Sequence, residues 1–207
     1  DLFRKTGDKT LTADDDVIVA LDVLASVVDT HSLDLSNMKL TEDAVISLIT
    51  VLPNLDQLQT LNLSGNTLSV ACMLVLALSL KMMIELRSLK LSKTGLGRDG
   101  THLVKILSAC HQLEQLDLSG NQLGQNGAVI LSQSLKFMPR LRVLNLDGNS
   151  IGLEGIRSLA ALLVQCTRLE ELQLGRTSLG DEGSVALSQC LTSLPNLRIL
   201  NLDGNSI

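Results

Sequence analysis

Leucines recur along this chain at a nearly constant interval, and this interval constrains the fold more than any other feature of the sequence. The central leucine of each repeat is followed by the next after 28 residues, and once after 27. These leucines are Leu33, Leu61, Leu89, Leu116, Leu144, Leu172 and Leu200. A fixed period of about 20 to 50 residues is typical of solenoids, in which each repeat folds as one small unit stacked on the next.

The first half of each repeat has the pattern of a short strand that ends in a turn. Leu116 and Leu118 alternate with polar residues, which is the period of a β-strand with its apolar side inward. Asn121 follows where the chain must turn, and its amide can bond to backbone groups that the turn leaves unpaired.

The second half of each repeat has helical spacing. Gly127, Leu131 and Leu135 are four residues apart and share one helix face. No single repeat can bury its own leucines, so stability must come from contacts between neighbouring repeats. The sequence therefore predicts an α/β fold, a curved solenoid or horseshoe with parallel strands on its concave face and α-helices on its convex face.

The repeat phrase resembles the consensus of the ribonuclease-inhibitor-like class of leucine-rich repeats. The best examples are Leu-Asn-Leu-Ser-Gly-Asn at 61–66 and Leu-Asn-Leu-Asp-Gly-Asn at 144–149, and the resemblance covers about residues 31–207. Ribonuclease inhibitor itself is similar in placing Cys in some Asn positions, whereas no Cys stands there in this chain. The resemblance is greatest to the leucine-rich repeat region of NOD-like receptors, which implies a role in innate immunity.

The chain divides into two parts by its pattern. Residues 1–30 predict a polar segment followed by a capping helix, and residues 31–207 predict seven leucine-rich repeats with the last one truncated. The chain lacks an initiator Met and stops within a repeat phrase. We therefore expect it to be a piece of a longer protein.

The composition argues against nucleic-acid and membrane partners. The net charge is −5, and Phe3 and Phe137 are the only aromatic residues. A basic surface and several stacking rings are the usual means of binding nucleic acid. No apolar run is long enough to span a membrane. The four cysteines do not have the paired spacing of a zinc site, and we expect buried, reduced thiols in a cytoplasmic protein.

Catalytic chemistry is not expected, and neither is a cofactor or a metal. His31, His102 and His111 fall in different layers of the predicted repeat stack, and no carboxylate is placed to orient any of them. The acidic run at 14–16 is better explained as a helix start, where the helix dipole favours negative charge. The sequence thus predicts a protein that is not an enzyme.

Charged residues on the outward side of the strands are the candidate partner-binding residues. They are Arg87, Lys90, Lys93, Glu114, Asp117, Arg142, Asp147, Glu171 and Arg176. In one interpretation Arg87, Lys90 and Lys93 form a basic spot complementary to a partner. In the other, Lys90 faces Asp117 on the next strand, about 4.8 Å away, and the charges serve the sheet itself.

Three functions follow as hypotheses. The first is a non-enzymatic module that binds another protein or senses a ligand through its concave face, within a larger intracellular protein of NOD-like-receptor type. The alternative is a GTPase-activating or effector domain similar to Ran GTPase-activating protein, although no residue here matches that family's functional Arg or Asn. The third is a structural spacer.

Overall fold

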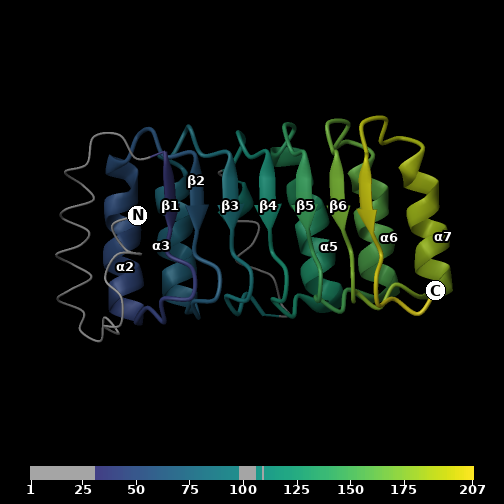
Figure 1. Ribbon diagram of the computed structural model, residues 1–207, viewed down its shortest axis with the longest axis horizontal. Helices are drawn as coiled ribbons and strands as arrows, with labels where there is room; N and C mark the ends of the chain where they lie inside the picture. The colour runs from purple at the N-terminus through teal and green to yellow at the C-terminus, as the bar shows by residue number, and fades with distance from the viewer. Residues whose placement is uncertain (1–30, 98–105, 109) are drawn as a thin grey trace.

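The computed structural model describes residues 31–97, 106–108 and 110–207. The predicted capping helix within 1–30, the acidic run at 14–16 and His102 lie outside the described residues. Seven short strands form one sheet, in which each strand pairs in parallel with the next one along the chain. Figure 1 shows them side by side and pointing the same way, with the described helices behind them.

The strands are three residues long and recur once per repeat. They are β1 (Ser32–Asp34), β2 (Thr60–Asn62), β3 (Ser88–Lys90), β4 (Gln115–Asp117), β5 (Val143–Asn145), β6 (Glu171–Gln173) and β7 (Ile199–Asn201). Each central leucine is aligned with the central leucine of the next strand, from Leu33 with Leu61 to Leu172 with Leu200. The predicted leucine register is confirmed.

The described helices are ten to twelve residues long and lie on one side of the sheet. They are α2 (Glu42–Val51), α3 (Val70–Leu80), α5 (Gly124–Ser134), α6 (Gly152–Leu163) and α7 (Gly180–Leu191), with 3₁₀ turns η1 (Leu52–Asn54) and η2 (Leu135–Phe137). Thr41 and Ser69 cap α2 and α3 by accepting hydrogen bonds from Ala44 N and Cys72 N, both at 3.2 Å. The three later helices begin at a glycine instead.

The core lies between the sheet and the helices and is continuous along the stack. The central leucines from Leu33 to Leu172 are at most 4% exposed, because every second strand residue faces the helices. Cys72, Cys110, Cys166 and Cys190 are buried, and none of them forms a disulfide. Burial raises the pKa of the Cys110 thiol to about 12 and that of Cys166 to about 11.

An α/β solenoid with one open sheet is therefore the architecture of this chain. The other face of the sheet, which we call the open face, is covered by none of the elements that the structure describes (Figure 1). No described helix is both long and apolar enough to cross a membrane.

Candidate functional site

The candidate residues lie at several different positions along the strands and the segments that flank them. Arg87, Glu114 and Arg142 stand just before their strands, at the edge where the strands begin. The remaining six lie within the strands or beyond them: Lys90, Asp117 and Glu171 belong to β3, β4 and β6, and Lys93, Asp147 and Arg176 follow β3, β5 and β6. The structure thus divides the predicted set instead of gathering it into one site.

Ion pairs join several charges at the edge where the strands begin. The Arg142 guanidinium donates from Nε and Nη2 to the two carboxylate oxygens of Glu170, at 2.8 and 3.0 Å, and its Nη1 lies 3.6 Å from Glu114. The hydrogen bonds to Glu170 raise the pKa of Arg142, and the same bonds lower the pKa of Glu170. Arg87 Nη2 lies 3.7 Å from Glu85 Oε2, which makes a further ion pair.

A cavity of about 350 Å³ lies beside these pairs. It is lined by Glu114, Arg140, Arg142, Arg168, Glu170 and Asn196. Arg140 and Arg168 were not among the predicted residues. Their spacing of one repeat, each directly before a repeat leucine, is the signal that could have identified them.

Lys90 is the last residue of β3. It stands opposite Asp117 in the β3–β4 register, as predicted, but the structure shows no ion pair between Lys90 and any residue that it describes. Its charge acts on Asp34 two strands away. Burial tends to raise the pKa of Asp34, but hydrogen bonds from Ser36 and Asn62, together with Lys90, outweigh it and lower the pKa. The basic spot and the strand-to-strand pairing both remain hypotheses.

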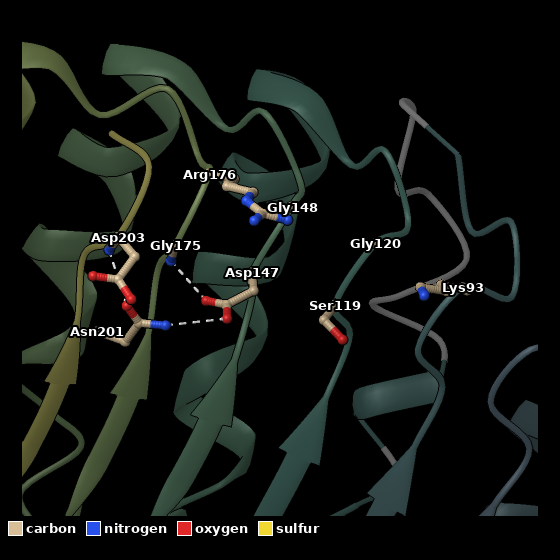
Figure 2. A pocket seen from close by; sticks show the side chains of 9 residues that line it. All are labelled: Lys93, Ser119, Gly120, Asp147, Gly148, Gly175, Arg176, Asn201 and Asp203. Carbon is tan, nitrogen blue, oxygen red and sulfur yellow. Dashed lines mark hydrogen bonds between the residues drawn. The ribbon is translucent and has the colours of Figure 1, made fainter. Parts of the chain in front are cut away.

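A second and larger cavity lies where the strands end, and we call it the strand-end pocket. Its volume is about 390 Å³. It is lined by Lys93, Ser119, Gly120, Asp147, Gly148, Gly175, Arg176, Asn201 and Asp203 (Figure 2). The carboxyl ends of neighbouring parallel strands meet at one edge of a sheet, and this brings residues from successive repeats together. Three of the predicted residues, Lys93, Asp147 and Arg176, meet here.

Asp147 is held in place by the two repeats that follow it. Its Oδ1 accepts a hydrogen bond of 2.6 Å from Gly175 N, and its Oδ2 accepts one of 3.3 Å from Asn201 Nδ2. Figure 2 shows the carboxylate turned toward these two partners and away from Ser119 and Lys93. The charge of Asp147 is therefore largely satisfied by its own neighbours.

Lys93 and Arg176 occupy equivalent places in their repeats, and both have left-handed backbone conformations, each with φ of 53°. The equivalent residue is glycine in four of the other five repeats, with φ between 65° and 73°: Gly65, Gly120, Gly148 and Gly204. Sequence reasoning selected Lys93 and Arg176 for their charge. It missed the glycines, although the sequence shows that a basic residue replaces glycine at this position in two of the repeats.

Comparison with known proteins supports the repeat assignment. A family model described as "Leucine Rich repeat" matches residues 109–132, 138–160 and 165–188. These segments include β4, β5 and β6 and most of α5, α6 and α7, so the matched unit coincides with the observed strand and helix. The three matched segments, which cover about a third of the chain, are therefore similar to leucine-rich repeats. No significant match is found among curated proteins.

Solved structures with similar folds are found as well. The complex of TLR13 with the single-stranded RNA ssRNA13 is 26% identical, with a TM-score of 0.52, over 74% of this chain. The solenoid spans only 20% of the length of that protein. The leucine-rich repeat protein LegL7 of Legionella pneumophila is 22% identical over 94% of this chain and 71% of its own, with a TM-score of 0.47. The C-terminal domain of Caenorhabditis elegans tropomodulin is 14% identical over 88% of this chain and 93% of its own, with a TM-score of 0.46.

Proposed function

We propose that the open face of this solenoid binds a protein partner, and that the chain is the interaction or sensing part of a larger cytosolic protein of NOD-like-receptor type. The observation that carries the proposal is the uncovered polar face itself. Its outward strand residues are polar or charged except Val143 and Ile199, and the described helices all lie behind it. A rigid array of strands presents those side chains at fixed spacing. The receptor type rests on the resemblance of the repeats.

A protein partner suits this face better than a nucleic acid. The TLR13 structure holds RNA, but this chain has a net charge of −5 and two aromatic residues. Phosphate backbones are bound mainly by Lys and Arg, and unpaired bases by aromatic stacking. The face offers hydrogen-bond donors, acceptors and both signs of charge, which are features of the polar parts of protein interfaces.

Site-specific photo-crosslinking in cells tests which face is used. A photoreactive amino acid replaces Gln115 or Ile199 on the open face, within the whole protein that contains this chain. Matched controls place it at Leu78 or Val185 on the helices, which are 63% and 60% exposed against 52% for Ile199. We expect one protein adduct from both open-face positions and not from the helix positions. Adducts from the helix positions alone, or from none, contradict the proposal.

The GTPase-activating alternative makes a different prediction. GTP turnover by a panel of small GTPases, measured with and without the chain, is expected to be unchanged. Faster GTP turnover by any one of them would contradict the interaction module and support an effector function.

A further inference from the structure

The strand-end pocket contains two basic side chains that no carboxylate within residues 31–97, 106–108 and 110–207 neutralises. Arg87 and Arg142 on the open face form ion pairs, whereas neither Lys93 nor Arg176 pairs with an acid among the residues that the structure describes. Asp147 lines the same pocket, but its oxygens are engaged by Gly175 and Asn201. Asp203 lines the pocket too, but it forms no ion pair with Lys93 or Arg176, so both positive charges stay available to a ligand.

These basic residues stand where the backbone favours glycine. A left-handed conformation is costly for residues with a Cβ, and glycine holds this place in most repeats. Residues kept in an unfavourable conformation are concentrated at functional sites. Both basic residues are also followed by Thr, at Thr94 and Thr177, where four of the other repeats have Asn. A basic residue followed by Thr thus replaces Gly-Asn twice, in repeats that are three apart.

Of the glycines between the two charges, Gly148 leaves room for a ligand, whereas the Lys93 side chain occupies the space over Gly120. The Lys93 side chain passes over Gly120, where an added Cβ would lie 2.9 Å from Lys93 Cγ. The nearest atoms to an added Cβ at Gly148 are backbone atoms of Gly120, at 3.8 Å. A side chain at Gly148 would fill part of the pocket between Lys93 and Arg176, whose places Figure 2 shows.

We propose that the strand-end pocket binds an extended acidic peptide segment, with one carboxylate against Lys93 and a second against Arg176. Three strand spacings separate the two basic residues, which is about 14 Å at about 4.8 Å per strand. An extended peptide rises about 3.3 Å per residue, so acidic residues about four positions apart match this distance. This inference rests on the proposed function, because it names the class of partner segment that the open face accepts.

A peptide fits this pocket better than a phosphate ligand. One phosphate group is too small to reach both basic residues. A nucleic-acid backbone would bring many negative charges past Asp147 and Asp203, which line the same cavity. A peptide can donate its backbone N–H groups to the Asp203 carboxylate, which a phosphate backbone cannot do.

Peptide titration of the 207-residue chain, followed by amide NMR, tests the proposal. The probe is the capped peptide Glu-Gly-Gly-Gly-Glu, and the comparison peptide has Gln in place of both Glu residues. We expect the Glu peptide to shift the amide signals of Gly120, Gly148 and Arg176. The Gln peptide is expected to leave them in place, and added salt is expected to weaken the binding of the Glu peptide. Inorganic phosphate is titrated in parallel.

Substitution by glycine removes the charges without harming the fold. Lys93→Gly and Arg176→Gly introduce the residue that most repeats already carry at this position, and glycine adopts positive φ freely. We expect each to weaken binding roughly two- to fivefold, the range of a single exposed ion pair. Lys39→Gly is the matched control: Lys39 also has a positive φ, of 52°, but does not line the pocket, and binding should be unchanged.

The outcomes separate this inference from the proposed function. Failure of the Glu peptide to shift the pocket amides at about 10 mM, well above the concentration range of weak specific binding, would overturn the inference. Equal binding of the Glu and Gln peptides, or binding of phosphate in preference to the Glu peptide, would overturn it too. Crosslinking of a partner from Gln115 and Ile199 would still stand in each of these cases.

Discussion

The Asn121 side chain connects two repeats through their backbones. Its Nδ2 donates to Leu91 O at 2.6 Å and to Leu118 O at 2.9 Å, while its Oδ1 accepts from Thr94 N at 2.9 Å. Thr94 takes the same place one repeat earlier. Its hydroxyl reaches Leu91 O at 2.8 Å and then Oδ1 of Asn121, so it satisfies its own turn but has no amide to bridge to the preceding repeat.

Replacing Asn121 by alanine should leave several buried backbone groups without partners. Because each such group costs about 1–3 kcal/mol, we expect Asn121→Ala to lower the free energy of unfolding by about 2–5 kcal/mol. Urea denaturation measures this. Asn196→Ala is the control, because Asn196 is exposed and donates one hydrogen bond, to Thr167 O at 2.8 Å. Equal losses in the two variants would contradict the role given to Asn121.

The buried thiols make the fold sensitive to alkaline pH. Cys110 and Cys166 have raised pKa values, of about 12 and about 11, because burial disfavours the thiolate. In the unfolded chain they ionise near the ordinary thiol value of 9.0. Above that pH the unfolded state holds fewer protons than the folded state, so stability must fall as pH rises from about 9 toward 11–12.

We expect the free energy of unfolding to fall by about 2–4 kcal/mol between pH 9 and pH 10.5, since each group contributes about 1.4 kcal/mol per pH unit. Urea midpoints at a series of pH values measure the slope. The chain has no tyrosine, which removes one other group that titrates in this range. A variant with Cys110→Ala and Cys166→Ala should show a much smaller slope, and an unchanged slope would assign the effect to other groups.

At the scale of the elements, small residues determine how closely a helix approaches its neighbours. An added Cβ at Gly155, in α6, would collide with the Ile151 side chain and would lie 2.8 Å from the Ala128 Cβ in α5. At Gly183, the equivalent position in α7, the nearest atom would be Leu179 Cγ at 3.3 Å. The two glycines are therefore equivalent in sequence but not in packing.

Alanine should destabilise the fold at Gly155 but not at Gly183. Gly155→Ala forces helices α5 and α6 apart, and we expect it to cost about 1–3 kcal/mol. Gly183→Ala needs a shift of a flexible leucine only, and the higher helix propensity of alanine, about 1 kcal/mol, should offset it. Thermal unfolding of the two variants measures the difference. A Gly183→Ala variant as unstable as Gly155→Ala would mean that both helix starts are packed equally tightly.

The elements of one repeat could be predicted from sequence because their determinants are local or recur at the period. The alternation around Leu116 and the spacing of Gly127, Leu131 and Leu135 each report a backbone geometry, and the period aligns the leucines of neighbouring strands. The charged contacts were less predictable. Lys90 and Asp117 are in register but form no ion pair, because the register fixes the Cα positions and not the long side chain of lysine.

The strand-end pocket was only partly predictable for the same reason. Its charged residues, Lys93, Asp147 and Arg176, could be selected as outward residues of their repeats. These residues share a cavity because small residues, Gly120 and Gly148, lie between them. The cavity also depends on hydrogen bonds that turn the Asp147 carboxylate away from Lys93. Both are properties of three or more repeats together, which a description of one repeat does not contain.

At the scale of the whole molecule, each described repeat contacts mainly its neighbours in the stack, so stability depends on interfaces between adjacent repeats. Leu144 lies in β5, between β4 and β6, and is fully buried. Leu200 lies in β7, which pairs with β6 alone among the described strands, and it is only partly buried. The same substitution should therefore destabilise different sets of strands at these two positions.

Hydrogen exchange of the backbone amides can follow this spread. Leu144→Ala removes a buried side chain shared by two interfaces, and we expect a loss of about 2–5 kcal/mol, with faster exchange in β4, β5 and β6. Leu200→Ala should cost less and raise exchange in β6 and β7, leaving β2 and β3 protected. If Leu200→Ala accelerated exchange equally along the whole sheet, the repeats would unfold as one unit, and the solenoid would not behave as a chain of neighbouring interfaces.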